Sequence, residues 1–255
     1  MSELGALVRP VSASFARALS AVVPDPPIDV GLARTQHAAY VSALSRAGAR
    51  IETLPALDES PDAVFVEDTA VVVGGVAIVT RPGAPSRRDE TESVAEALAR
   101  DHDVARMHAP AALDGGDCMR VGDTLYVGRS ARTNADGVAF LRRLPVRVVP
   151  VDLPDHVLHL KCVCSPLGGD RVLLAEGSLD GAVFGGKELV FVPRSEAYAA
   201  NAVAVGRTVL VAAGYPRTAE RLDRLGFDVV PIESSEARKA DGSLTCQSIL
   251  TGSDR

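Results

Sequence analysis

A cysteine near the end of the chain is the residue best suited to nucleophilic chemistry. Cys246 follows the turn-type dipeptide Asp241-Gly242. A cysteine thiolate is a strong nucleophile, and a lone cysteine with a histidine elsewhere in the chain is a candidate for covalent catalysis. The competing interpretation is a small buried apolar residue, which is the usual role of a free cysteine. We assign that role to the other three cysteines, which are Cys118, Cys162 and Cys164.

His159 is the histidine whose surroundings best suit a fixed acid/base group. It lies between Leu158 and Leu160 in a β-rich segment, whereas the other histidines occupy helical or loop-like contexts. Imidazole exchanges a proton near neutral pH and is the commonest general acid or base in enzymes. The alternative is a histidine that only packs in the core.

Several carboxylates stand where apolar segments begin. Glu67 and Asp68 interrupt the apolar run from Phe65 to Val71, and Asp62 precedes it. Carboxylates inside such a run are costly to bury unless a cation accompanies them. Either a neighbouring arginine and main-chain amides satisfy Glu67 and Asp68, or a cationic substrate does.

A second acidic segment, Asp114-Gly115-Gly116-Asp117, precedes another β-type run. Asp-Gly pairs are common in turns, which favours a turn here. The glycines would also let the backbone approach a ligand closely.

A repeat runs along the chain and must position these residues. Two β-type runs, Val64–Val73 and Val76–Val79, flank the pair Gly74-Gly75, and helical spacing follows at Asp89–Arg100. Similar units recur about every 45–50 residues, in the range of repeat architectures. The later pairs of runs are Cys118–Val121 with Leu125–Gly128, Leu158–Cys164 with Val172–Ala175, and Asn201–Val205 with Thr208–Ala212. Helices follow two of these pairs, at Asp136–Leu144 and Thr218–Leu225, and a further strand is expected at Val229–Ile232.

The two ends of the chain supply a fifth unit, from Ala6–Arg9 and Leu244–Leu250. Five such units predict a ring of β-containing blades in one domain spanning residues 1–255, with polar strand ends directed at a central channel. An ordinary three-layer α/β fold with several hairpins is the alternative. A helix is expected at Ala33–Ala47, after a proline-rich loop.

Composition and charge limit the classes of function. Of 255 residues, 47% are hydrophobic and 24% are charged, which supplies a sizeable core. The formal net charge is -6 without a basic stripe, so a nucleic-acid partner is not expected, whereas a cationic small molecule would be attracted. No apolar run approaches the roughly 20 residues that span a bilayer. With neither a secretory leader pattern nor dense cysteines, we expect a cytoplasmic protein.

Six segments, in this order and spacing, resemble the dimethylarginine dimethylaminohydrolases of the amidinotransferase/deiminase superfamily. They are Pro61–Asp68, Thr80–Arg88, Leu113–Asp117, Ser130–Asn134, Leu158–Lys161 and Asp241–Cys246. The resemblance covers nearly the whole chain. It implies an α/β fold, a five-bladed α/β propeller (pentein) with pseudo-fivefold ββα-type repeats around a central active-site channel. It also implies hydrolysis of Nω-methylated L-arginines to L-citrulline and methylamine or dimethylamine, with no cofactor and no metal.

The resemblance assigns roles to individual positions. Cys246 is the expected nucleophile, His159 the general acid and base, and Asp114 the carboxylate that supports His159. The expected substrate-binding residues are Asp68 and Glu67 for the guanidinium, Arg87 and Arg132 for the α-carboxylate, Asp62 for the α-amine, and Leu19, Ala240 and Asp241 around it.

Two alternatives remain at this stage. The same chemistry could act on arginine, hydroxyarginine or another guanidine. The chain is too short for the extra helical domain of arginine deiminases, and an agmatine-type enzyme would not need Arg87 and Arg132. A non-catalytic binding propeller would lack Cys246, His159 or the acidic partner, and all are present. A homodimer is compatible with the sequence.

Overall fold

Small mixed sheets of one repeated design make up the β-structure of residues 4–252, the part of the chain that the computed structural model describes. Five three-stranded sheets form, with strand orders β15-β1-β2, β3-β4-β5, β6-β7-β8, β9-β10-β11 and β12-β13-β14. In each sheet the central strand pairs antiparallel with the first strand and parallel with the third. The repeat expected from the sequence is therefore present, and each unit has one strand more than a hairpin.

The strands are short and the helices lie mostly between second and third strands. The strands are β1 Gly5–Val8, β2 Arg50–Thr53, β3 Ala70–Val73, β4 Val76–Val79, β5 Asp103–Arg106, β6 Cys118–Val121, β7 Thr124–Arg129, β8 Arg147–Asp152, β9 Cys164–Gly168, β10 Arg171–Ala175, β11 Glu188–Val192, β12 Val203–Val205, β13 Thr208–Ala212, β14 Asp228–Ile232 and β15 Ile249–Thr251. The α-helices are α1 Val30–Arg46, α2 Glu92–Leu98, α3 Ala135–Leu141, α4 Pro216–Arg224 and α5 Ser235–Lys239.

The first sheet joins the two ends of the chain. β15 pairs antiparallel with β1, which places Leu7 opposite Ile249 and Gly5 opposite Thr251. A Cβ at Gly5 would lie 2.4 Å from the Thr251 hydroxyl, so a glycine is needed for this close approach. The pairing places Cys246, three residues before β15, in the same unit as the N-terminal strand.

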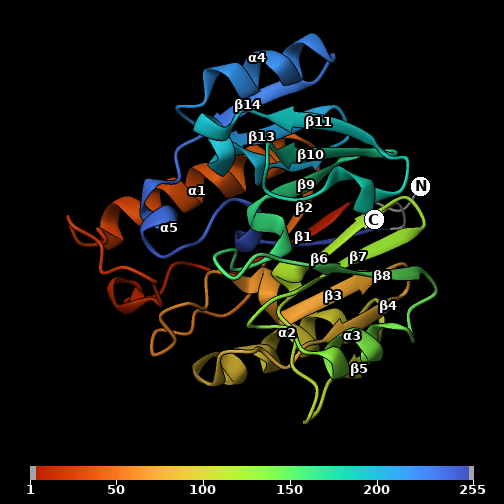
Figure 1. Cartoon of the computed structure of the whole chain (residues 1–255). Helices are drawn as coiled ribbons and strands as arrows, with labels where there is room; N and C mark the ends of the chain where they lie inside the picture. The colour runs from red at the N-terminus through yellow and green to blue at the C-terminus, as the bar shows by residue number, and fades with distance from the viewer. Residues whose placement is uncertain (1–3, 253–255) are drawn as a thin grey trace.

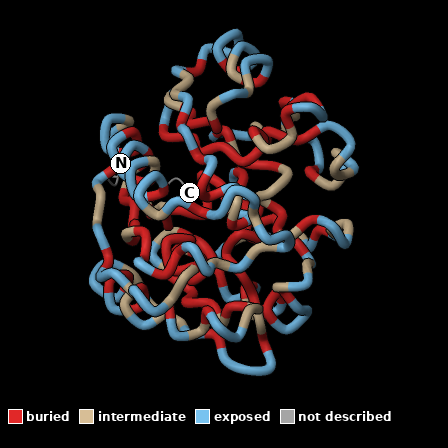
Figure 2. Tube along the Cα trace, turned by 90° about the vertical axis from the view of Figure 1, so that its left-hand side faces the viewer, coloured by how far each residue is buried: buried red, intermediate tan, exposed pale blue. Residues whose placement is uncertain are grey.

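The first strands of the sheets line a central cavity of about 930 Å³. Val71, Met119, Leu167, Ala204 and Leu250 each come from a different one of these strands. The helices lie outside the sheets (Figure 1). In Figure 2 the buried residues concentrate in the interior of the trace and the exposed residues at its outer bends. The first strand of every sheet therefore faces the same central cavity.

Helices cover the sheets through apolar side chains at helical spacing. In α1, Tyr40 and Leu44 are fully buried and pack with Ala6 and Val8 of β1. The helix begins after Asp29, whose carboxylate accepts a hydrogen bond from the Leu32 amide at 3.0 Å. Such a cap stabilises a helix by about 1 kcal/mol, and each large buried side chain contributes roughly 1.5–3 kcal/mol.

A 3₁₀ turn precedes the first strand of every sheet. These turns are η2 Val66–Thr69, η4 Gly115–Asp117, η5 Leu160–Cys162, η7 Arg194–Ala200 and η8 Thr245–Gln247. The sequence prediction extended strands over Val64–Ala70, Leu158–Cys164 and Leu244–Leu250, and this was wrong at the turns. Buried apolar residues in or beside these turns, such as Val66, Leu160 and Leu244, made the local pattern resemble that of a strand.

Among the described residues, no helix is both long enough and apolar enough to cross a membrane.

Candidate active site

The turns bring most of the residues singled out from the sequence around one cavity of about 250 Å³. It is distinct from the larger central cavity. The predicted residues that line it are Leu19, Asp62, Asp68, Arg87, Arg132, His159, Ala240, Asp241 and Cys246. Phe65, Leu158 and Gly242 add an apolar wall. Asp114 lies behind His159, and Glu67 faces elsewhere.

Cys246 lies in turn η8 with only 8% of its surface exposed. It packs in an apolar cluster with Phe15, Phe65 and Ala240, and it lines the cavity. Burial raises the pKa of its thiol well above the usual value, and the nearby carboxylates of Glu67 and Asp68 raise that pKa further. The free protein therefore holds Cys246 as a thiol.

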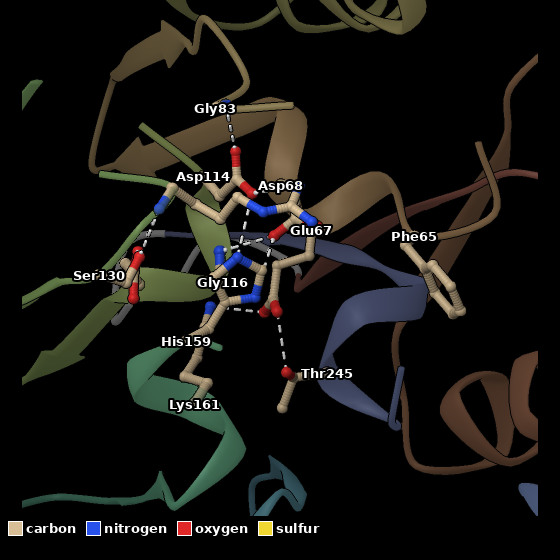
Figure 3. A network of polar contacts seen from close by, with 12 residues as sticks. Phe65, Glu67, Asp68, Gly83, Asp114, Gly116, Ser130, His159, Lys161 and Thr245 are labelled. Atoms are coloured by element: carbon tan, nitrogen blue, oxygen red, sulfur yellow. Dashed lines mark hydrogen bonds and ion pairs between the residues drawn. The ribbon is translucent and has the colours of Figure 1, made fainter. Parts of the chain in front are cut away.

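His159 immediately precedes turn η5, and its ring lies between two carboxylates (Figure 3). Its Nε2 is 3.0 Å from Asp114 Oδ2, and its Nδ1 is 3.9 Å from Asp68 Oδ1. Burial alone would lower the pKa of this imidazole, but Asp68, the hydrogen bond to Asp114 and the nearby Asp117 raise it to about 9. His159 is therefore a cation at neutral pH and can supply a proton.

Asp114 is fully buried and orients His159. Its Oδ1 accepts a hydrogen bond from the Gly83 amide at 2.8 Å, and its Oδ2 faces both His159 and, at 3.8 Å, Arg132 Nη1. A Cβ at Gly83 would lie 2.4 Å from the Arg132 carbonyl oxygen, so this loop approaches as closely as only glycine permits. The acidic segment is thus more than a turn.

Asp68 presents an ionised carboxylate to the cavity. Arg87 Nη1 donates to its Oδ2 at 2.5 Å, and the Gly116 amide donates to its Oδ1 at 3.0 Å. Although burial opposes ionisation, His159 and Arg87 hold the pKa of Asp68 below its usual value. The local arginine that the sequence left open as a partner is therefore Arg87.

Arg87 is buried, and protein oxygens hold most of its guanidinium. Nε and Nη2 donate to the Glu90 carboxylate, and Nη2 also donates to the carbonyl oxygens of Phe65 and Asp62. Against the effect of burial, Asp68 and Glu90 raise its pKa, so the group stays charged. Arg132 is less enclosed, with 23% of its side chain exposed at the cavity.

Glu67 is paired within the protein. Lys161 Nζ donates to its Oε1 at 2.5 Å and Thr245 Oγ1 to its Oε2 at 2.8 Å (Figure 3). Glu67 and Lys161 line the central cavity of about 930 Å³ and are not among the residues around Cys246. Glu67 thus has local partners, but these are a lysine and a threonine hydroxyl and not the arginine or main-chain amides that the sequence suggested.

The segment after Leu19 covers the cavity through two carboxylates. Asp62 Oδ1 accepts from the Leu19 amide at 3.0 Å, and Asp241 Oδ2 accepts from the Ala21 amide at 2.5 Å. Burial raises the pKa of Asp62, and Arg87 partly offsets this. Asp241 has a left-handed backbone with φ 54°, which is rare outside glycine.

The sequence reasoning missed residues that hold the nucleophile turn. The Asn201 amide group donates to the Lys161 carbonyl at 2.8 Å and to Thr245 Oγ1 at 3.0 Å, and its oxygen accepts from the Thr245 amide at 2.9 Å. The Tyr198 hydroxyl donates to the Gly242 carbonyl at 2.9 Å. Both residues stand before the first strand of a repeat, as the catalytic candidates do, and that position was the available signal.

In the described part of the chain, Asp68, Asp114 and His159 offer possible metal-ligand atoms within 4.8 Å of one another. Both carboxylates already accept hydrogen bonds, from Arg87, Gly116 and Gly83. These contacts suit a cluster that holds and moves a proton.

Comparison with known proteins gives a consistent family. The family model described as "N,N dimethylarginine dimethylhydrolase, eukaryotic" matches residues 28–194. An N(G),N(G)-dimethylarginine dimethylaminohydrolase of Pseudomonas aeruginosa is 40% identical over 87% of this chain and 89% of its own length. A protein of the same name from Streptomyces coelicolor is 42% identical over 98% of this chain and 97% of its own length.

Solved structures agree. A cysteine-to-serine mutant of the Pseudomonas aeruginosa enzyme, complexed with citrulline, has a TM-score of 0.93 and 36% identity, covering 98% of this chain and 100% of that chain. The N-terminal domain of ArgZ, a cyanobacterial arginine dihydrolase, has a TM-score of 0.89 at 19% identity, covering 98% of this chain and 97% of that one. At that identity the likeness concerns the α/β fold alone.

Proposed function

The chain belongs to the dimethylarginine dimethylaminohydrolase family, and from this premise and the site geometry we propose that it hydrolyses Nω-methylated L-arginines to L-citrulline and a methylamine. The observation that carries the proposal is the cavity on which Cys246, His159 and Asp68 all open, with Asp114 behind His159. A nucleophile, a proton donor and an anion for a cationic substrate thus converge. The repeated sheet order supports the finer assignment of a five-bladed α/β propeller.

Substrate binding follows from the charges around the cavity. Asp68 is ionised and accepts the guanidinium. Arg132 is the more exposed of the two arginines at the site and is the direct ligand for the α-carboxylate, since an arginine fork matches a carboxylate. Arg87 adds charge beside it but chiefly fixes Asp68, because Glu90 and main-chain oxygens hold its Nε and Nη2 groups.

The α-ammonium group fits beside Asp62, whose carboxylate interacts electrostatically with Arg132. Asp62 supplies a carboxylate there, and the main-chain carbonyls of Leu19 and Ala240 are further acceptors. Asp241 lines the same wall and holds the covering segment by the Ala21 amide. Arg132 and Asp62 would therefore hold the two α-groups of an amino-acid substrate at its α-carbon.

The first chemical step forms a bond from sulfur to carbon. The guanidinium of the bound substrate stabilises the Cys246 thiolate, because a nearby cation lowers a thiol pKa, and the thiol proton passes to solvent since His159 is already protonated. The thiolate attacks the guanidinium carbon and gives a tetrahedral adduct. Protonated His159 then gives its proton to the methylated nitrogen, the C–N bond breaks, and the amine leaves. A thiouronium remains on Cys246.

The second step uses the same histidine in the opposite sense. Neutral His159, held by Asp114, takes a proton from water as the water attacks the thiouronium carbon. The C–S bond then breaks, the hydroxyl proton of the adduct passes to the departing sulfur, and citrulline is released while His159 remains protonated for the next cycle. Asp68 lies beside His159 and holds the cationic carbon fragment through both steps.

The test is citrulline release by the purified protein from asymmetric dimethylarginine, monomethylarginine, arginine and agmatine, beside a Cys246→Ser control. The proposal expects turnover of the methylated arginines and its loss in the control. Turnover of arginine or agmatine alone would be compatible with the proposed mechanism but would contradict the assignment of methylated arginines as substrates. An inactive, folded protein would favour a binding role.

A further inference from the structure

Asp117 is a buried carboxylate that the reaction described above does not use. It ends turn η4, three residues after Asp114, and none of its surface is exposed. It does not line the cavity around Cys246. A carboxylate in such a place is costly unless its oxygens are fully satisfied, so its partners show what it does.

Three donors converge on this carboxylate. Oδ2 accepts from Ser130 Oγ and from Thr133 Oγ1, both at 2.6 Å, and Oδ1 accepts from the Leu160 amide at 2.9 Å. Gly128 makes room for it, because a Cβ there would lie 2.5 Å from Asp117 Oδ1.

Each hydroxyl connects Asp117 to a residue of the site. The Arg132 amide donates to Ser130 Oγ at 3.0 Å, and the Asp114 amide donates to Thr133 Oγ1 at 3.3 Å. A hydroxyl has one hydrogen, so each can accept from the amide and direct that hydrogen at Asp117. All three partners are therefore donors, which is the pattern of an ionised acceptor. The third partner, Leu160, directly follows His159.

We propose that Asp117 is a positioning residue for this active site, whose single carboxylate holds Arg132 through Ser130, Asp114 through Thr133, and His159 through the Leu160 amide. This inference rests on the proposed function only where it uses kinetics. The connections from Asp117 through the Ser130 hydroxyl and through the Thr133 hydroxyl, here called the Ser130 arm and the Thr133 arm, have separate roles. The Ser130 arm places the guanidinium that binds the α-carboxylate, and the Thr133 arm places the carboxylate that orients the acid/base imidazole.

Each of the two connections can be removed separately by a substitution that deletes its hydroxyl group. In Ser130→Ala we expect KM for a methylated arginine to rise about tenfold with kcat within about twofold, since one hydrogen bond behind Arg132 is lost. In Thr133→Val we expect kcat to fall about tenfold with KM nearly unchanged, because Asp114 and His159 lose alignment. Asp117→Asn should show both effects. Ser178→Ala is the matched control: it loses a 2.7 Å hydroxyl bond to the Ala175 carbonyl outside the site.

A second readout does not need turnover. The proton shared by His159 Nε2 and Asp114 gives an NMR resonance that should shift strongly in Thr133→Val and in Asp117→Asn, only slightly in Ser130→Ala, where the effect comes through Arg132 at 3.8 Å from Asp114 Oδ2, and not at all in Ser178→Ala. The inference is overturned if Ser130→Ala and Thr133→Val have the same effect on kcat and the same effect on KM. It is also overturned if the two variants shift the His159–Asp114 resonance by the same amount. Wild-type inactivity on every guanidine would overturn the proposed function instead, and the NMR comparison would still decide the role of Asp117. If Asp117→Asn does not fold, the two hydroxyl variants carry the test.

Discussion

Nε2 of His159 lies 3.0 Å from Oδ2 of Asp114, a carboxylate with no exposed surface. The hydrogen bond leaves Nδ1 on the side of Asp68 and the cavity. One nitrogen is thus held by the protein while the other faces the reacting groups. This arrangement determines how the site should respond to pH and to mutation.

The pKa of His159 is the first quantity to test. Asp68 and Asp114 raise it to about 9 despite burial, so the imidazole should titrate near that pH in an NMR experiment on the free protein. Asp114→Asn removes the charge that supports the imidazolium and should lower the midpoint. A wild-type midpoint near the usual value of 6.5 would contradict the account.

The same group should make folding stability depend on pH. Because the folded-state pKa of His159 lies above its unfolded value, the imidazolium stabilises the fold fully below about pH 6.5, and this stabilisation is lost as the pH rises through about 9. Denaturant melts of the wild type should show a falling free energy of unfolding over that window. His159→Gln should show a smaller fall; an identical fall would assign the effect to other groups.

The thiol of Cys246 should ionise when the substrate binds. Its pKa is raised well above the usual value in the free protein, by burial and by Glu67 and Asp68. In His159→Ala, which cannot protonate the leaving amine, thiolate absorbance should grow at a lower pH once methylarginine is added, and Cys246→Ser should lack the signal. Equal titrations with and without ligand would refute substrate-assisted ionisation.

Glycine at position 116 is needed next to the reacting groups. A Cβ there would lie 2.7 Å from His159 Nδ1 and 2.8 Å from Asp68 Oδ1. Gly116→Ala should therefore lower kcat/KM about a hundredfold, as a displacement of catalytic groups by about 1 Å does. Gly75→Ala is the control, because nothing lies within 4 Å of its Cβ position and its φ is not positive. Equal activity of the two variants would show that a Cβ at position 116 does not displace His159 and Asp68.

Asp241 combines backbone strain with a contact to the covering segment. Its φ is 54°, and its carboxylate accepts from the Ala21 amide. Asp241→Gly should be more stable to unfolding than Asp241→Ala by about 1 kcal/mol, since only glycine adopts this φ freely. Both variants should raise KM to a similar extent, because both lose the contact. A KM equal to that of the wild type in either variant would show that the contact between Asp241 and Ala21 does not help to hold the segment over the cavity.

Much of the fold was predictable because each repeat contains apolar runs separated by glycine-containing turns. The central strands β4, β7, β10 and β13 lay within or close to the predicted runs. Of the third strands, β14 was predicted at Val229–Ile232, whereas β5 and β8, whose residues are mostly half-buried or exposed, were missed. Helix α1 starts earlier than predicted, at Val30, because Asp29 caps it.

The site residues themselves were predicted through family resemblance, and their local structure was not. His159 and Cys246 were placed on strands, but lie at 3₁₀ turns, which the apolar neighbours Leu160 and Leu244 conceal. Supporting residues such as Asn201 and Asp117 bond to partners at least 13 residues away, which spacing does not reveal. The structure was needed to show which carboxylates face the cavity and which face the protein.

The central claim is that Cys246 forms a covalent thiouronium with a methylated arginine, and mass spectrometry of an acid-quenched turnover mixture tests it most directly. The account predicts an adduct on the peptide containing Cys246, which accumulates in a variant slowed in the second step and disappears as citrulline forms. An adduct on another residue, or turnover by Cys246→Ser at the wild-type rate, would contradict it.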